Sequence, residues 1–578
     1  MRSIRPSRLS SATFAAKAHI LQAARYVSDL RQPVRRLGHA SPREYRELLA
    51  ECRTPLWTAE SLVENSLQFG KIQNLRKACR RLHCVTIPAG ETFSFWKQLG
   101  KAKASAGYVV GRELRQGCLI PSLGGGLCQL SNSLYELALC TGCEIVERHA
   151  HTAVVPGSAA EQGRDATVFW NYVDLRFRPR QSILITTVLT KQELIVRFWG
   201  AKALFLISAP KTTARSASVT NTCTDCGVAE CFRHIPAHSS ALSGNNAFVI
   251  EECWPEFERY VEAIRSDNDD LFLPYHSNLR RIPRYTWNSR GYRRIVSANS
   301  LIITAALFKK LRLNDTSPPV AAQLKRSEQL ASYYSLRLAI HSTRIYVAQS
   351  LLPFFWRNGD LGGRNFSVLM TRLPLRELHQ ELDSLVARYP DRRSFQEFRA
   401  PQWMVQAETE ALECAEQIIT PHVCLAALFR SKAALLPWKL PEARRLRGSH
   451  IIFPGPALAR KGAFELRTAL RGLPYRLRVL HSTAESHDFW HGVPLSTSSN
   501  DWLEDAAVVV QPAFLENNPR PLLRALAAGI PVIATPECGI PEHPLLTLVP
   551  AGDADGLREK LQILAHELPE SGVTRRDN

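Results

Sequence analysis

The order of hydrophobic and polar positions divides the chain into two parts with different periodicities. Between residues 44 and 82, apolar side chains recur three and four positions apart, which predicts helices. The clearest run is Ile72, Leu75, Cys79 and Leu82. Residues 166–179 and 182–200 instead alternate apolar and polar positions, which predicts strands, with a hairpin turning near Lys191. The first part is therefore expected to be an α+β domain.

From Ala247 onward, short apolar strands alternate with helical segments. The predicted strands cover residues 248–252, 345–350, 366–371, 417–422, 450–455, 476–481, 507–512, 530–535 and 545–550. Strands that alternate with helices form parallel sheets. Two such runs in succession predict two doubly wound α/β domains, which bind ligands at the carboxyl ends of their strands.

A chain of 578 residues is long enough for several domains, each with its own core. We therefore expect a multidomain protein, an α+β domain followed by two α/β domains. The predicted divisions are a basic arm at 1–40, the α+β domain at 41–204, a linker with a Cys/His module at 205–245, and α/β domains at 246–440 and 441–578.

The charge balance is strongly basic, with 73 Lys and Arg against 53 Asp and Glu. Such a balance fits nucleic acid, an anionic membrane surface or a phosphate-bearing substrate. Residues 8–31 are amphipathic and poor in acids, so they either lie on anionic lipid or form a solvated basic arm. No apolar run is long enough to span a bilayer, and the N-terminus lacks a secretory pattern. We expect a cytoplasmic protein with peripheral contact at the inner face of the membrane, and the oligomeric state stays open.

Three glycines, Gly124–Gly126, stand directly before Cys128, which opens a predicted helix over Leu127–Thr141. Glycines allow tight turns and the close approach of a ligand. The N-terminus of a helix carries a positive dipole end, which stabilises a thiolate and lowers the pKa of the thiol. These features make Cys128 a candidate nucleophile.

Two histidines and an acid follow. His149 and His151 are two positions apart on a predicted strand, so they should share a face, and Asp165 precedes the next strand. A thiol, an imidazole and a carboxylate in this arrangement are typical of a nucleophile, a base and an orienting acid, with His151, or alternatively His149, as the base. Alternatively, Cys128 is a small buried hydrophobic residue and the histidines are structural.

A second cluster of thiols lies in the predicted linker. The segment CTDCGVAECFRH contains four candidate metal ligands, Cys223, Cys226, Cys231 and His234. Thiolates with an imidazole suit structural Zn²⁺, and an iron–sulfur centre is the second choice. His238 or Cys253 could complete the set, and a loop of free thiols is the alternative. A nucleic-acid contact at the neighbouring Arg233 is the least favoured reading.

The last domain carries a candidate phosphate site. Arg460 and Lys461 precede Gly462 and a predicted helix, and cations at a helix N-terminus bind phosphate together with its free N–H groups. Farther on, Glu516 lies in a loop after a predicted strand. Ordinary packing of an α/β sheet beside an exposed pair of charges is the alternative.

Residues 60–180 resemble the VanW family. The resemblance rests on five segments, KIQNLRKACRRL, IPAGETFSFWKQLG, GYVVGRELRQGCLIPSLGGGLCQLSNSLYELAL, EIVERHAHT and GRDATVFWNYVDLRFR. It implies a bacterial protein linked to the cell envelope or to glycopeptide resistance. It supplies no mechanism, so the role of Cys128 comes from residue chemistry alone.

Residues 440–565 resemble the nucleotide-sugar domain of retaining GT-B glycosyltransferases, through GPALARKG and LENNPRPLLRALAAGIPVIA. The resemblance implies that Lys461 is the clamp lysine, that Arg460 replaces the clamp arginine, and that Glu516 contacts the sugar. The glutamate that grips ribose falls on Arg524, and a guanidinium cannot accept hydrogen bonds from ribose hydroxyls. Either the nucleotide is held differently or the domain no longer uses sugar nucleotides.

The preceding α/β domain fits the acceptor domain of that family by architecture, with Thr420–His422 near the crossover between the domains. The main hypothesis is glycosyl transfer from a nucleotide sugar to an envelope glycan or a lipid-linked precursor. One alternative is acyl or amide chemistry at Cys128. The other is a binding scaffold without catalysis.

Overall fold

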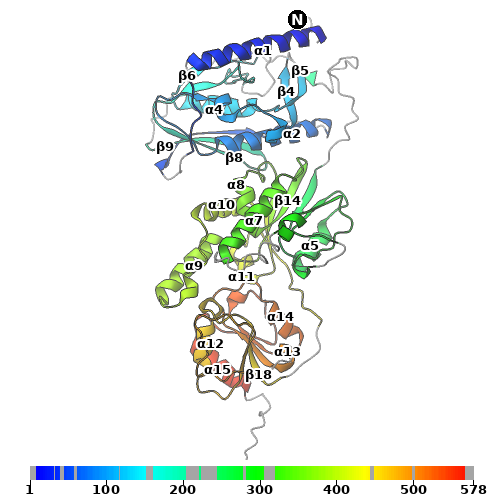
Figure 1. Cartoon of the computed structure of the whole chain (residues 1–578), viewed down its shortest axis with the longest axis vertical. Coiled ribbons are helices and arrows are strands. Elements are labelled where there is room, and N and C mark those ends of the chain that lie inside the picture. The colour runs from blue at the N-terminus through cyan, green and yellow to red at the C-terminus, as the bar shows by residue number, and fades with distance from the viewer. Residues whose placement is uncertain are drawn as a thin grey trace, which may run out of the picture. The chain divides into compact units, whose positions relative to one another are not determined.

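The computed structural model describes residues 8–31, 33–39, 44–57, 62–115, 118–151, 160–202, 221–222, 244–277, 282–304, 319–442, 448–497 and 501–565. The chain divides into two compact units. The first contains residues 1–246, 337–345 and 355–365, and the second contains residues 247–336, 346–354 and 366–578. Their elements are labelled in Figure 1.

The first unit is built on a four-stranded antiparallel sheet in the order β1-β9-β8-β2. These strands are β1 (Glu47–Pro55), β9 (Glu193–Gly200), β8 (Ile183–Leu189) and β2 (Val85–Ile87). Helix α2 (Leu62–Leu82) packs on this sheet with fully buried Ile72, Leu75 and Leu82, as their spacing predicted. β8 and β9 form the predicted hairpin.

The helix predicted from residue 44 is wrong for its first part, because residues 47–55 form β1. This strand pairs with β9 from Glu47 to Pro55, and pairing across a sheet outweighs the weak helix preference of a short segment. The predicted strand at 166–179 is also largely irregular, with β7 limited to Arg176–Arg178.

Two smaller sheets complete the first unit. One has the order β3-β7-β6, with β3 at Phe93–Ser94 and β6 at Glu144–Glu147. The other has the order β10-β5-β4, with β10 at Asn221–Thr222, β5 at Cys118–Leu123 and β4 at Val110–Arg115. The turn after β5 leads into α4 (Cys128–Cys140), so it places Cys128 at the start of a helix.

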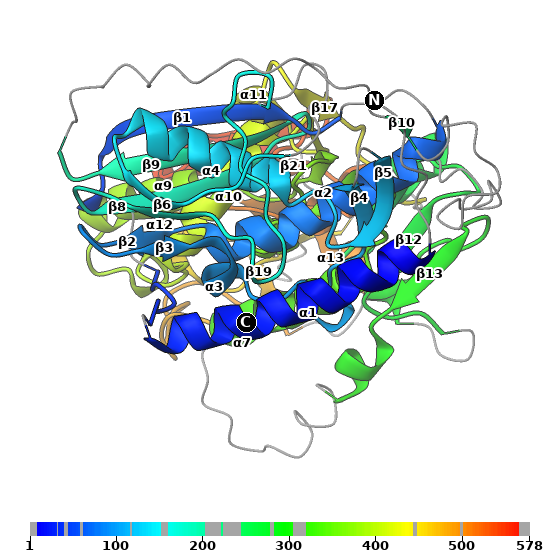
Figure 2. The ribbon, with the colours of Figure 1, turned by 90° about the horizontal axis from the view of Figure 1, so that it is seen from above.

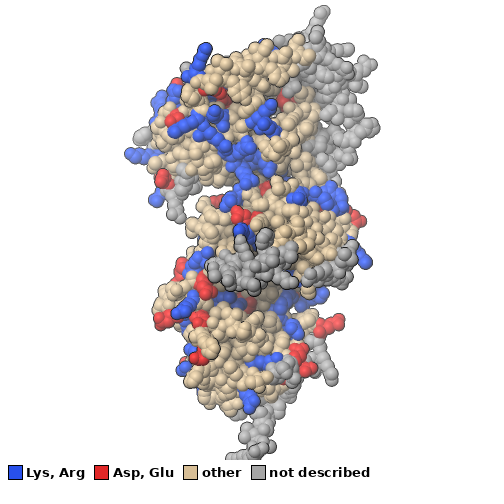
Figure 3. Space-filling view, viewed as in Figure 1, with Lys and Arg blue, Asp and Glu red and all other residues tan. Residues whose placement is uncertain are grey.

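Helix α1 (Arg8–Arg31) lies along the first unit (Figures 1 and 2). Its Gln22 donates a hydrogen bond to the carbonyl of Trp170 over 2.7 Å, and Arg25 donates to the carbonyl of Tyr172 over 3.0 Å. Lys and Arg side chains gather on the face of this unit that Figure 3 shows. None of the helices in the described ranges is long and apolar enough to cross a membrane.

The second unit contains two sheets whose described pairings are parallel, as the alternation of strands and helices predicted. The seven-stranded sheet has the order β13-β12-β11-β14-β15-β16-β17 and the five-stranded sheet the order β19-β18-β20-β21-β22. The multidomain α+β and α/β fold class is therefore confirmed. The bounds of the first sheet are β11 (Asn245–Val249), β12 (Asp270–Leu273), β13 (Arg294–Ser297), β14 (Ser342–Ala348), β15 (Asn365–Leu369), β16 (Gln417–Thr420) and β17 (Ala433–Leu435).

The five-stranded sheet consists of β18 (His450–Phe453), β19 (Leu477–Val479), β20 (Ala506–Gln511), β21 (Val532–Ala534) and β22 (Leu546–Leu548). All six residues of β20 are buried, because helices cover both faces of a parallel sheet. The segments that leave the carboxyl ends of β20, β21 and β22 form one edge of this sheet. The helices used below are α5 (Pro255–Ile264), α9 (Leu375–Arg388), α12 (Ala463–Leu470), α13 (Trp502–Asp505), α14 (Arg520–Ala527) and α15 (Ala554–Ala565).

Candidate functional site

The glycine segment before Cys128 is required by packing. Gly124 and Gly126 have φ of 78° and 98°, a left-handed conformation that favours glycine. A Cβ atom on Gly126 would lie 2.2 Å from Cγ of Lys71, and one on Gly125 would lie 2.6 Å from the backbone of Gly111. The expectation that these glycines keep space open for a ligand is therefore wrong: α2 and β4 fill that space.

The structure brings Cys128, His151 and Asp165 together. Nδ1 of His151 lies 2.7 Å from Oδ2 of Asp165, and the backbone N–H of His151 donates to the same oxygen over 2.6 Å. This leaves Nε2 for the sulfur of Cys128, to which the ring is hydrogen bonded. The three groups thus form a continuous chain from thiol to carboxylate.

Asp165 is fully buried and held from a second side. Arg148 donates from Nη2 to Oδ1 of Asp165 over 2.9 Å and from Nε to its carbonyl over 2.7 Å. The same guanidinium lies over the ring of Tyr135, 5.1 Å from its centroid. Arg148 therefore fixes the carboxylate that orients His151.

The sulfur of Cys128 has two further partners from the segment after Asp165. It lies 3.8 Å from the hydroxyl of Thr167, and it accepts a hydrogen bond from the backbone N–H of Val168. Both donors stabilise a thiolate more than a thiol. Together with the positive end of α4, they give the sulfur an environment suited to negative charge.

The pKa values of the three groups are shifted in the directions expected for an ion pair. Burial raises the pKa of Cys128, but hydrogen bonding and charge from His151, with Val168 and Thr167, lower it overall. Burial lowers the pKa of His151, whereas Asp165 and Cys128 together raise it to about 9. Burial raises the pKa of Asp165, but His151 and Arg148 lower it to about 2. Both shifts favour a thiolate on Cys128 beside an imidazolium on His151, relative to an isolated thiol and imidazole.

His149 does not join this group. The strand expected to carry both histidines ends earlier, because β6 stops at Glu147. The side chain of His149 is 47% exposed, and its Nε2 lies 3.2 Å from Oε1 of Glu147, whereas the side chain of His151 is 13% exposed. The expectation that the two histidines share a strand face is wrong.

In the second unit, Lys461 and Glu516 form a nearly buried ion pair. Nζ of Lys461 lies 2.9 Å from Oε2 of Glu516, and the lysine and glutamate side chains are 13% and 6% exposed. Gln511 donates to the same oxygen, and the N–H of Asn518 donates to Oε1 over 2.9 Å. The carboxylate is thus held at the carboxyl end of β20, where α/β sheets bind ligands.

Gly462 gives this site its backbone geometry. It has φ of 75°, and a Cβ on it would lie 1.9 Å from the carbonyl oxygen of Pro512. It joins a short turn containing Lys461 to α12. Because no other residue fits here, Gly462 sets the position of Lys461 beside the segment that follows β20.

The other two predicted donor-site residues differ from each other. Arg460 lies near Glu516, and its guanidinium is 4.9 Å from the ring centroid of Phe398. No described residue forms a hydrogen bond with its buried Nε. Arg524 is exposed on α14, with its guanidinium 5.2 Å from the ring centroid of Trp502 on α13. Among the described residues, no hydrogen bond or ion pair links Arg524 to the Lys461–Glu516 pair.

His422 belongs to the same edge and was named only by its place after a predicted strand. It is 1% exposed, and its Nε2 lies 2.9 Å from the carbonyl oxygen of Asn517, the residue after Glu516. Burial lowers the pKa of His422 to about 4, so the imidazole is neutral. A Cβ on Gly539 would lie 2.3 Å from its Nδ1, so the glycine is required for this contact.

Arg520 and Glu256 form a second buried pair close by. Nη1 of Arg520 donates to Oε1 of Glu256 on α5 over 2.9 Å, and the guanidinium lies 5.1 Å and 5.4 Å from the rings of Trp254 and Trp438. Neither residue was predicted from the sequence: Glu256 belongs to no motif, and Arg520 lies within LENNPRPLLRALAAGIPVIA but at a position to which no role was assigned. The TPH segment ending in His422 was the only signal for this part of the edge.

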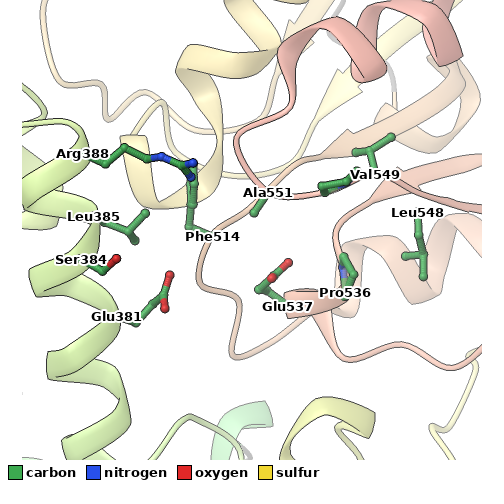
Figure 4. A pocket seen from close by; sticks show the side chains of 11 residues that line it. Glu381, Ser384, Leu385, Arg388, Phe514, Pro536, Glu537, Leu548, Val549 and Ala551 are labelled. Carbon is green, nitrogen blue, oxygen red and sulfur yellow. The ribbon is translucent and has the colours of Figure 1, made fainter.

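The second unit also contains a cavity of about 750 Å³ (Figure 4). Glu381, Ser384 and Arg388 of α9 lie on one side, and Phe514 and Glu537 lie on the other. Phe514 is two positions before Glu516. The volume lies in the range usual for small-ligand sites.

The predicted metal ligands Cys223, Cys226, Cys231 and His234, with His238, lie outside the described residues. Among the residues that are described, no group of three or more His, Cys, Asp and Glu side chains could hold a metal ion. Burial raises the pKa of Cys253, the remaining candidate, to about 12, which disfavours its thiolate.

Two parts of the chain match family models. Residues 70–199 match the model described as VanW like protein, and residues 457–567 match the model described as Glycosyl transferases group 1. Among characterised and uncharacterised relatives, Vancomycin B-type resistance protein VanW of Enterococcus faecalis is 34% identical over 134 residues, 23% of this chain and 49% of that protein.

A second relative, the uncharacterized protein YoaR of Bacillus subtilis, is 30% identical over 178 residues, 30% of this chain and 58% of its own length. The chain thus spans about half the length of the curated relatives it matches.

Solved structures to which the chain is similar include sucrose-phosphate synthase from Thermosynechococcus elongatus, with a TM-score of 0.37 and 16% identity, over 56% of this chain and 90% of that chain. HepE of Anabaena, solved with UDP and glucose, has a TM-score of 0.34 and 10% identity over 56% and 90%.

Proposed function

We propose that this chain, in which a VanW-like domain at residues 70–199 is joined to a glycosyltransferase group 1 domain at residues 457–567, transfers a sugar from a nucleotide sugar to an acceptor. The observation that carries the proposal is the buried Lys461–Glu516 pair at the carboxyl edge of the five-stranded sheet. Lys461 supplies a cation for the diphosphate, and Glu516 accepts hydrogen bonds from sugar hydroxyls.

The acceptor that we propose is an envelope glycan or a lipid-linked precursor. The VanW-like domain and the basic surface support this class. A screen of UDP- and GDP-sugars for stabilisation of the full chain against heat tests donor binding directly, because a bound ligand raises the melting temperature. The absence of any shift with every nucleotide sugar would contradict the proposal.

Arg524 affects how the nucleotide is held. A retaining reaction of the kind that the resemblance implies uses a carboxylate on ribose, and here the residue at that position is an exposed cation stacked on Trp502. The cavity lined by Glu381 and Glu537 offers other carboxylate acceptors for ribose hydroxyls. The proposal therefore assigns ribose recognition to this edge of the sheet and leaves Arg524 outside it.

A second function is favoured by the Cys128–His151–Asp165 arrangement, and we propose that it performs acyl or amide transfer. The thiolate of Cys128 attacks a carbonyl carbon, and the imidazolium of His151 gives its proton to the leaving amine or alcohol. A second nucleophile then loses a proton to His151 and releases the acyl group from sulfur. Asp165 keeps Nδ1 of His151 protonated throughout.

If no nucleotide sugar stabilises the folded chain and Cys128 does not react rapidly with an alkylating reagent, the remaining function is a binding scaffold. In that case the two domains position partners without chemistry. The alkylation rate of Cys128 in the wild type and in its variants distinguishes a scaffold from a thiol enzyme.

We also propose that Cys223, Cys226, Cys231 and His234 bind Zn²⁺, because their spacing suits a zinc site. Purified wild type is expected to contain about one equivalent of zinc, and Cys223→Ala is expected to lose it. Elemental analysis of both proteins is the measurement. Iron with visible absorption would identify an iron–sulfur centre, and equal metal content in both proteins would contradict a site at Cys223.

Peripheral contact with an anionic membrane is proposed for α1. Arg25 and Asp29 face the rest of the first unit, whereas Ile20, Val27 and Leu30 are 70%, 51% and 81% exposed. The full chain is expected to sediment with vesicles containing phosphatidylglycerol, and Ile20→Ser with Leu30→Ser is expected to reduce binding about tenfold, because less apolar area enters the interface. Equal sedimentation with pure phosphatidylcholine vesicles would contradict the electrostatic part of this proposal.

A further inference from the structure

Lys71 is a buried cation beside the glycine segment that leads to Cys128. It lies on α2, is 5% exposed, and packs so closely on Gly126 that a Cβ there would lie 2.2 Å from its Cγ. Burial and the nearby charge of Arg112 lower the pKa of Lys71 to about 7. Among the described side chains, none forms an ion pair or hydrogen bond with its ammonium group.

Arg112 is the second cation at this place. It lies on β4, and its backbone nitrogen is 2.8 Å from the position that a Cβ on Gly125 would take. Its Nη1 is buried and has no hydrogen-bond partner within the described part of the chain. The charge that acts on Lys71 is thus a like charge, and neither the ammonium group of Lys71 nor Nη1 of Arg112 has a partner among the described side chains.

The backbone between these cations is held in place. Asn74, one turn after Lys71 on α2, donates to the carbonyl of Gly125 over 2.9 Å and accepts from the N–H of Val109 over 2.9 Å. Unpaired buried cations destabilise a fold, and two that repel each other do so more. An anion between them would remove both penalties, and the fixed backbone means that little has to move.

We propose that Lys71 and Arg112 bind an oxyanion, a carboxylate or a phosphate, carried by the compound on which Cys128 acts. The inference rests on the proposed thiol chemistry and gives its substrate class: an acyl compound with a negatively charged group. Gly125 and Gly126 separate the two cations from Cys128 by only a short stretch of chain, so the anion would be held beside the helix start that carries the sulfur.

The first experiment compares two alkylating reagents of similar size, anionic iodoacetate and neutral iodoacetamide, on the full chain. The ratio of their rates at Cys128 is expected to fall about tenfold in Lys71→Met and in Arg112→Gln, with the rate of iodoacetamide little changed. Lys77→Met is the matched control, because Lys77 lies on the same helix and burial lowers its pKa too, but the charge of the nearby Asp360 partly offsets that lowering. An unchanged ratio in both variants would overturn the proposal and leave the thiol chemistry intact.

The second experiment uses calorimetry with inorganic phosphate and with acetate at pH 8, where Lys71 is largely neutral. A bound anion favours the ammonium form, so binding is expected to take up a proton, and the heat should depend on the buffer. Phosphate or acetate binding with this signature, lost in Lys71→Met, supports the site even if Cys128 proves unreactive. Binding without proton uptake in wild type would contradict it. Lys71→Met is expected to remain folded and to raise the melting temperature, because it removes a buried unpaired charge and keeps an unbranched side chain that is only one atom shorter.

Discussion

Cys128 is expected to react with iodoacetamide at pH 7 at least ten times faster than Cys140, and Cys128→Ser is expected to remove this fast phase. The two thiols lie at opposite ends of α4, so they share a helix and form an internal control. Charge and hydrogen bonding from His151 lower the pKa of Cys128 against the effect of burial, whereas burial and Glu136 raise the pKa of Cys140 to about 11. An ordinary thiol is only about 3% ionised at pH 7, and the thiolate is the reacting form.

Peptide mass spectrometry after short labelling separates these thiols from the other cysteines. His151→Gln is expected to slow the labelling of Cys128 about tenfold or more, and His149→Gln is expected to leave it unchanged, because His149 pairs with Glu147 instead. Equal rates at Cys128 and Cys140 in the wild type would remove the basis for a thiol enzyme. If only His149→Gln slowed the labelling, the base would be His149 and not His151.

The pH dependence of Cys128 alkylation follows from the pKa shifts of Cys128 and His151. As pH rises through the lowered pKa of Cys128, thiolate forms beside protonated His151, and labelling reaches a plateau. Above about pH 9, His151 loses its proton, but Cys128 remains a thiolate, so labelling continues. Acyl transfer should instead decline above that pH, because the leaving group no longer receives a proton. The two profiles therefore separate at high pH.

The thiol site was predictable from the sequence to the extent that its signals are local. Three glycines before a helix, and an Arg-Asp pair before the next segment, identified Cys128 and Asp165. The choice between His149 and His151 was not predictable, since it depends on β6 ending at Glu147 and on Asp165 reaching back across 14 residues to His151. The pairing of Lys71 with Arg112 could not be predicted from the sequence, because only the tertiary structure shows that no acidic side chain lies beside Lys71.

The α/β part was more predictable, for a physical reason. Strands buried on both faces, such as β20, form continuous apolar runs that helices separate, so their order along the chain is visible. A short edge strand such as β1 is different, because its pairing with β9 sets its conformation and its own periodicity resembles a helix. Lys461 and Glu516 were named from motifs 55 residues apart, and their 2.9 Å contact depends on Gly462 packing against Pro512.

Lys461→Met is expected to weaken the binding of a UDP- or GDP-sugar about 10- to 100-fold, because a charge-assisted contact to phosphate contributes about 1.5–3 kcal/mol. Glu516→Gln keeps the shape of the side chain but removes its charge. It is expected to reduce sugar transfer or hydrolysis about 100-fold, with a smaller effect on binding of the nucleotide alone. Titration calorimetry with the free nucleoside diphosphate and with the nucleotide sugar separates these two contributions.

Lys560→Met is the matched control for this series, since Lys560 on α15 pairs with Glu559 over 3.3 Å at an exposed position of the same α/β unit. It should leave binding and transfer unchanged. Lys461→Met also leaves Glu516 with only Gln511 and Asn518 as partners, so a lower melting temperature alone would not indicate a donor site. The double variant Lys461→Met with Glu516→Gln removes both charges and should recover part of that stability without recovering donor binding. If the double variant regained donor affinity together with stability, the Lys461–Glu516 pair would be structural. A site that binds the diphosphate through Lys461 cannot regain affinity when residue 461 is methionine.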